Sequence, residues 1–104
     1  MHYAGGQRNG FQRLEQELLQ ARFDTLARIS RTLEEHLETL EHLREKIERA
    51  AGEEERSPLV AEFNQAREPA KRYRWYLEVQ RDVMGLRNHG LDEFYRVPPR
   101  IEQM

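Results

Sequence analysis

The sequence has no cysteine, a single tryptophan, and only four prolines and six glycines among its 104 residues. Without cysteine, the chain cannot form disulfides, thiolate metal sites or a cysteine nucleophile. Long apolar runs are missing as well: no window approaches the roughly 18 apolar residues that cross a membrane, and the start of the chain lacks a signal-peptide core. These absences predict a soluble, cytoplasmic protein that does not enter a membrane.

A large excess of charge of one sign is also missing, since 17 basic residues stand against 19 acidic ones. This balance gives no global attraction to nucleic acid or to an anionic membrane. Charged residues still make up 35% of the chain, against about 25% in ordinary domains, which suits thin helices with a large solvated surface. A chain of this length forms one domain, and its core is marginal unless a partner shares it.

An apolar repeat with alternating steps of four and three residues runs from Leu19 to Ala51. Its members are Leu19, Phe23, Leu26, Leu33, Leu37, Leu40 and Ile47. A mean spacing of about 3.5 residues predicts a long helix that buries one seam against another helix. We expect this helix over about residues 11–51, after a glycine-rich, flexible arm at residues 1–10.

A second helix is expected after a short polar bend. Gly52 ends the first helix, and Ser57-Pro58 is a restart signal, because serine caps free amides and proline fits the first helical position. The second helix should span about residues 58–88, with Pro69 bending or splitting it. Residues 89–104 then form a short extended tail.

The two helices can be aligned with each other. The second helix repeats the four-three rhythm, and a short bend requires antiparallel packing. Residues whose numbers sum to about 110 then face each other, which pairs Leu33 with Leu77 and Ser30 with Gln80. The same register brings the acidic residues of 34–41 near the basic residues of 71–74. The predicted fold is therefore all-α: a long antiparallel, coiled-coil-like helical hairpin that dimerises into a four-helix bundle.

Apolar residues outside the seam are the reason to expect self-association. On the first helix they are Leu14, Leu18, Ile29, His36 and Leu43. On the second helix, the predicted partner-binding residues are Arg72, Trp75, Tyr76, Val79, Val83 and Leu86. Uncovered stripes on a thin hairpin indicate a homodimer or higher homo-oligomer, or docking on another protein.

Catalytic and metal sites are not indicated. Glu38 and His42 lie one helical turn apart, but such pairs are common on solvated helices, and no Glu-x-x-His pair of the di-iron bundle type is present. No serine with a plausible histidine and acid, no phosphate-binding glycine loop and no zinc motif occurs. We therefore expect no enzyme activity, no cofactor, no metal and no small-molecule substrate.

The favoured function is a non-enzymatic, self-associating scaffold or adaptor that mediates protein–protein interaction. The alternative is a nucleic-acid-binding accessory protein, because basic and aromatic side chains interleave in the second helix. They are Arg67, Lys71, Arg72, Arg74 and Arg81, with Tyr73, Trp75 and Tyr76. Acidic neighbours weaken this field, so nucleic acid is the less favoured partner, and a ferritin-like metal protein ranks third.

Overall fold

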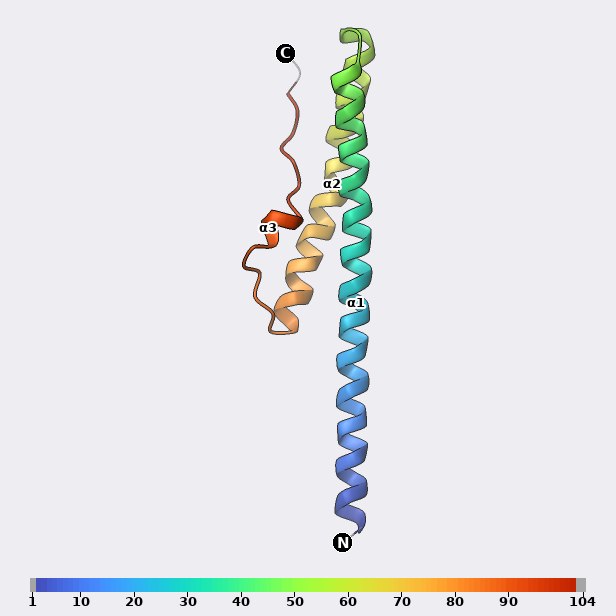
Figure 1. Ribbon diagram of the computed structural model, residues 1–104, viewed down its shortest axis with the longest axis vertical. Helices are drawn as coiled ribbons and strands as arrows, with labels where there is room; N and C mark the ends of the chain where they lie inside the picture. Colours follow the sequence, from blue (N-terminus) through green and yellow to red (C-terminus); the bar gives the residue numbers. More distant parts are fainter. Residues whose placement is uncertain (1, 103–104) are drawn as a thin grey trace.

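A computed structural model describes residues 2–102 of the chain, with side chains from Asn9 onward. This part is all-helical and contains α1 (His2–Arg49), α2 (Glu53–Val83) and the short α3 (Leu91–Phe94), with no strand among the described residues. The molecule measures 79 × 20 × 16 Å, because a helix as long as α1 rises about 1.5 Å per residue. Figure 1 shows α1 and α2 running antiparallel, as expected, with α1 extending well beyond the end of α2. No helix in residues 2–102 has the length and apolarity to cross a membrane.

The first helix begins earlier than the sequence indicated. Residues from His2 to Gly10, expected to form a flexible arm, are helical in the structure. Glycine in a helix interior costs about 1 kcal/mol relative to alanine, which weakens a helix without forbidding it, and no proline interrupts this stretch. Met1, Gln103 and Met104, the outermost residues of the expected arm and tail, lie outside the described residues.

The turn between the two long helices is tighter than expected. Only residues 50–52 separate α1 from α2, and α2 begins at Glu53 instead of Pro58. Three glutamates in the first turn of α2 favour this earlier start, because negative charge stabilises a helix N-terminus. One of them, Glu55, also accepts a hydrogen bond from the Ala51 N–H at 3.0 Å. Pro58 therefore lies inside the helix and not at its first position.

Helix α2 continues through Pro69, so the proline, which was expected to bend or split the helix, does not split it. The buried side chains of Phe63, Ala70 and Leu77 hold both halves of α2 against α1. Burying a large apolar side chain contributes about 1.5–3 kcal/mol, so these contacts outweigh the roughly 3 kcal/mol that an internal proline costs.

The helix ends at Val83, several residues before the expected His89-Gly90. Gly85 has a φ of +72° and forms the left-handed cap of a Schellman motif. In this motif the Leu86 N–H bonds the Arg81 carbonyl at 2.8 Å, and the Gly85 N–H bonds the Asp82 carbonyl at 3.0 Å. Gly90, the glycine expected to end the helix, follows this cap and therefore does not set the end of α2.

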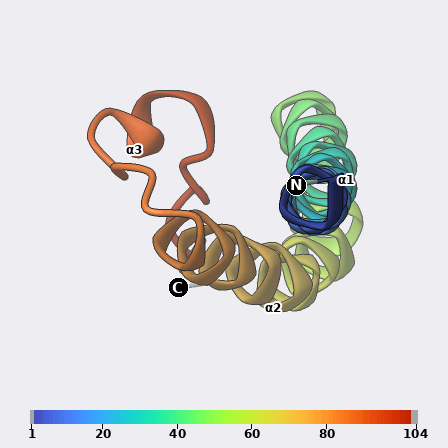
Figure 2. The ribbon, with the colours of Figure 1, turned by 90° about the horizontal axis from the view of Figure 1, so that it is seen from below.

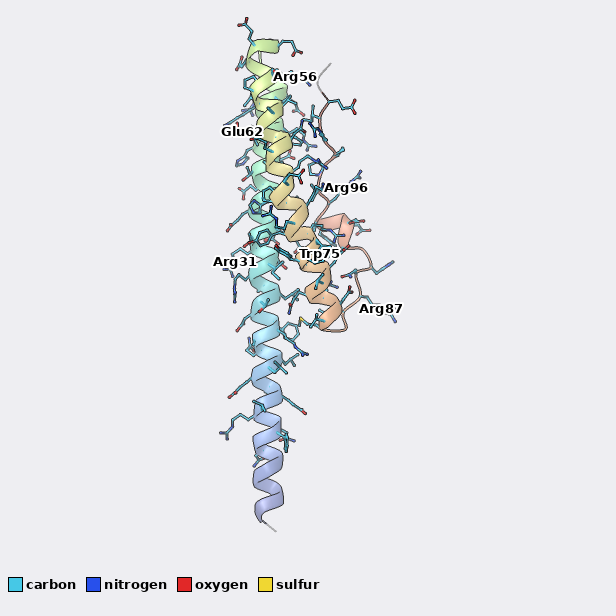
Figure 3. The ribbon with its side chains drawn as sticks, turned by 180° about the vertical axis from the view of Figure 1, so that it is seen from behind. Arg31, Arg56, Glu62, Trp75, Arg87 and Arg96 are labelled. Carbon is cyan, nitrogen blue, oxygen red and sulfur yellow. The ribbon has the colours of Figure 1, made fainter. Side chains whose placement is uncertain are left out.

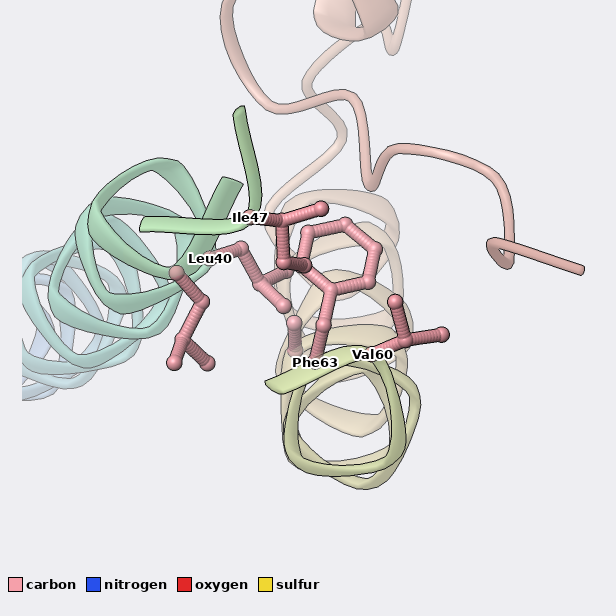
Figure 4. Packing of buried hydrophobic residues seen from close by; sticks show 6 residues of the cluster. Leu40, Ile47, Val60 and Phe63 are labelled. Carbon is pink, nitrogen blue, oxygen red and sulfur yellow. The ribbon is translucent and has the colours of Figure 1, made fainter. Parts of the chain in front are cut away.

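Two apolar clusters form the core between the helices. The cluster nearer the turn contains Leu40, Ile47, Phe63 and Ala70. Figure 4 shows the packing of this cluster from close by. The second cluster joins Leu33, Leu77 and Leu91. Pairs that the sequence placed opposite each other thus share a cluster, as expected for two long helices that pack against each other.

The polar contacts expected across the seam were wrong. Gln80 donates to the carbonyl of Arg22 at 3.3 Å instead of pairing with Ser30. The basic residues of α2 also form no ion pair with the acidic residues of 34–41 within residues 9–102. Arg74 pairs with Glu78 and Asp92, and Lys71 pairs with Glu68. These long polar side chains bind partners on their own helix or on the tail. An alignment of the two helices alone takes no account of such partners.

The C-terminal tail is a third packed element. After Gly90, at φ +76°, α3 turns the chain, and residues 95–102 run back beside α2 toward the hairpin turn (Figure 1). Viewed along the long axis, α2 lies between α1 and the segment that contains α3 (Figure 2). Leu91 is buried, and Val97 and Ile101 pack against the cluster nearer the turn.

Candidate protein-interaction surface

Five of the six predicted partner-binding residues lie exposed on α2. Val79 and Val83 are 40% and 57% exposed, Trp75 is 59% exposed, and Tyr76 and Arg72 also face solvent. Their spacing of three and four residues places them along one side of the helix. Leu86 does not belong with them, because it follows the end of α2 and is half-buried in the connection to α3.

A chain of aromatic rings ties this surface to α1. The Tyr76 ring lies 5.7 Å from Trp75 and 5.2 Å from Tyr73, between ring centroids, and Tyr73 lies 5.4 Å from His36 of α1. Such edge-on and tilted contacts are favourable and restrict ring rotation. The exposed face of Tyr76 is therefore held in place before any partner binds.

The outer part of α1 is the second exposed apolar surface. Every described side chain from Asn9 to Ala21 is exposed. The large apolar ones are Phe11, Leu14, Leu18, Leu19 and Phe23, which are 46% to 67% exposed. The sequence placed Leu19 and Phe23 in the hairpin seam, and this was wrong because α2 ends too early to cover them.

Both exposed surfaces reach the end of α2. The contact between Gln80 and the Arg22 carbonyl lies near this end. Val83, about one turn further along the antiparallel α2, lies near the level of Arg22 and Phe23, where the exposed part of α1 begins. We call the combined surface of Phe11, Leu14, Leu18, Leu19, Phe23, Trp75, Tyr76, Val79 and Val83 the uncovered stripe.

The tail packs along a different edge of α2. The helix line that contacts it holds Asn64, Arg67 and Arg74, which bond Ile101, Pro98 and Asp92 respectively. Trp75 stands at the border, because it shares a groove with Asp92, Glu93 and Arg96 as well as contacting Tyr76. Figure 3 shows Trp75 on α2 at the level of α3. The tail therefore leaves most of the uncovered stripe exposed.

Asn64 and Arg67 were not recognised as tail-binding residues from the sequence. One signal could have found Asn64: asparagine is unfavourable in a helix interior, because its side chain competes for backbone hydrogen bonds. An asparagine in the middle of a strong helix therefore indicates a specific polar partner, although the sequence does not say which one.

Tyr95 is the titratable group of the tail with a clear electrostatic signature. Burial raises the pKa of its phenol above the ordinary value of 10.0, and the hydrogen bond that the hydroxyl donates to Glu34 Oε1 at 3.1 Å raises it further. Contact with the Ser30 hydroxyl lowers this pKa, as does the charge of Arg81, but burial dominates. The phenol thus stays protonated where α1 meets the tail.

The histidine and carboxylate considered as metal ligands remain on the solvated face of α1. His42 Nε2 and Glu38 Oε1 are 4.0 Å apart, and both side chains are mostly exposed. Among the side chains of residues 9–102, no three histidine, aspartate or glutamate residues are grouped so that they could hold a metal ion.

No protein-family model, curated protein or solved structure matches the chain.

Proposed function

We propose that this protein is a self-associating helical scaffold whose uncovered stripe forms the interface of a two-fold homodimer. The exposed apolar side chains of the stripe are the observation that supports the proposal. The half of α1 beyond Arg22 carries four of them on a helix with no tertiary partner among its described side chains. Helices of this kind are marginal in water unless another surface packs on them.

Symmetry favours a second copy over a dissimilar partner, because most soluble oligomers are symmetric homo-oligomers. Burial of a Val, Leu or Phe side chain contributes about 1.5–3 kcal/mol, and association costs about 4–15 kcal/mol in lost freedom. A two-fold interface buries every stripe residue twice against one such cost. In this arrangement the two hairpins pack into a four-helix bundle, with the tails along its outside.

Nucleic-acid binding receives less support as a second candidate. Arg67, Arg74 and Arg81 bond the Pro98 carbonyl, Asp92 and the Asn88 side chain respectively. Tyr73 is half-buried against His36. Much of the basic and aromatic chemistry of α2 is thus engaged within the chain, and phosphate binding would have to break these contacts.

The test replaces Val79 and Val83 together with glutamate. Both side chains point away from the buried clusters, so helix content should stay unchanged while the molar mass by light scattering falls from dimer to monomer. Ala61 and Gln65 provide the matched control, since they are exposed and equally spaced on α2 but carry no large apolar group. Their replacement by glutamate adds the same charge and should leave the dimer intact.

Two outcomes would contradict the proposal. One is a dimer that survives the Val79 and Val83 substitutions unchanged. The other is equal dissociation in the Ala61 and Gln65 control, because general charge repulsion and not the apolar stripe would then explain the loss.

A further inference from the structure

The tail is held by contacts that recognise an extended backbone. The Asn64 side-chain amide donates to the Ile101 carbonyl at 2.8 Å and accepts from the Ile101 N–H at 2.9 Å. One side chain thereby satisfies both backbone groups of one residue, as a neighbouring strand would. Three residues further along α2, Arg67 Nε donates to the Pro98 carbonyl at 2.7 Å. These bonds fix the direction and register of the bound segment without reading its side chains.

Apolar positions supply the side-chain selectivity. Val97 and Ile101, four residues apart, pack on the cluster that contains Leu40, Val60 and Phe63. Between them, Pro98 and Pro99 restrict the backbone to extended conformations, which lowers the entropy lost on docking. The site therefore selects an apolar residue, two prolines, one free position and a second apolar residue.

Most of the buried core comes from the hairpin that binds the tail. Leu33, Leu40, Phe63 and Leu77 belong to α1 and α2, and Leu91 is the one buried apolar residue of the described tail. The connection between α2 and α3 has two glycines at positive φ, so a modest change of backbone angles there redirects the tail.

We propose that the α1–α2 edge lined by Asn64 and Arg67 is a recognition groove for an extended peptide, and that the chain's own tail is its resident ligand. The partner it fits is a protein segment with the tail's pattern of apolar residue, two prolines, any residue and apolar residue. A short connection gives the tail an effective concentration of about millimolar, so the tail excludes weaker partners. This groove lies apart from Val79 and Val83, and the proposal does not depend on dimerisation.

The experiment uses the full chain with its tail disabled by Val97→Asp and Ile101→Asp. The probe is a synthetic peptide of residues 91–102, labelled with a fluorophore at its N-terminus and followed by anisotropy. The disabled chain should bind the peptide about tenfold more tightly than the wild-type chain, whose own tail competes. Adding Asn64→Ala to the disabled chain should weaken binding about tenfold, since two hydrogen bonds are lost. The single Trp75, which borders the tail, gives a second readout because the peptide contains no tryptophan.

Circular dichroism on each variant shows whether the hairpin is intact, and Ile101→Asp alone carries the test if the double change lowers helix content. Absence of binding to a helical, disabled chain overturns the proposal. Equal binding by the wild-type chain, or binding that Asn64→Ala leaves unchanged, also overturns it, because the peptide would then occupy another surface.

Discussion

At the scale of single residues, Asn64 makes the most specific contact of the molecule. Replacing it with alanine removes two hydrogen bonds to Ile101, each contributing about 0.5–1.5 kcal/mol, while the better helix propensity of alanine returns about 0.5 kcal/mol. We expect a net loss of about 1 kcal/mol in the free energy of unfolding, measured by urea denaturation, and a changed Trp75 emission. Gln65→Ala, an exposed change on the same helix, should change neither the free energy of unfolding nor the Trp75 emission. Equal losses of stability in the two variants would contradict the role of Asn64 in holding the tail.

Tyr95 gives a prediction about alkaline pH. Its pKa is raised in the folded chain, chiefly by burial and then by Glu34. The unfolded chain therefore loses the Tyr95 proton near pH 10 while the folded chain keeps it, so stability is complete below pH 10 and declines above it.

Tyr95→Phe cannot titrate, and its stability should decline less than that of the wild-type chain between about pH 10 and pH 11.5. Urea denaturation at closely spaced pH values measures this difference. Parallel stability curves for the two proteins would show that Tyr95 does not contribute.

At the scale of elements, the ends of the helices depend on glycine geometry. Gly85 sits at φ +72°, where a Cβ is strained whatever the space around it. Gly85→Ala should cost about 1 kcal/mol or more in unfolding free energy. Gly52, the N-cap of α2 with an extended φ of −170°, accepts a side chain without strain, so Gly52→Ser should be neutral or slightly stabilising, because serine is a good N-cap residue. Equal losses from the two changes would exclude the Schellman cap as the reason that α2 ends where it does.

The helices also show which features of the fold can be predicted from the sequence. The hairpin and the residues that face its core were predictable, because Leu33, Leu40 and Leu77 belong to apolar repeats with helical spacing. The boundaries were not, since Gly52 competes with Ser57-Pro58 as a start and Gly85 competes with Gly90 as a stop. Where two local signals are of similar strength, tertiary packing determines which of them sets the helix boundary. A single sequence does not show this packing.

The residues predicted to bind a partner lie exposed along α2, apart from Leu86, because helical spacing determines which side chains share a face. Whether they bind a partner stays a prediction. The docking of the tail could not be predicted in the same way. Asn64 and Ile101 are far apart in the chain and belong to no repeat, so only the folded structure brings them together.

At the scale of the whole molecule, the hairpin has one edge that the tail covers and one apolar stripe that nothing in the described chain covers. The tail shields the edge of α2 near Asn64, while the stripe from Phe11 to Val83 leaves large apolar groups in water. Because α1 extends beyond α2, most of the exposed apolar side chains of α1 lie at one end of the molecule (Figure 1). In the proposed dimer, a second copy would cover both stripes at once.

The most direct test of this account is the molar mass of the wild-type protein, measured by sedimentation equilibrium from about one to one hundred micromolar. The account predicts a reversible dimer at twice the 12.5 kDa of one chain, with the Val79→Glu, Val83→Glu variant remaining at the monomer mass. A wild-type protein that stays at 12.5 kDa throughout this range would contradict it.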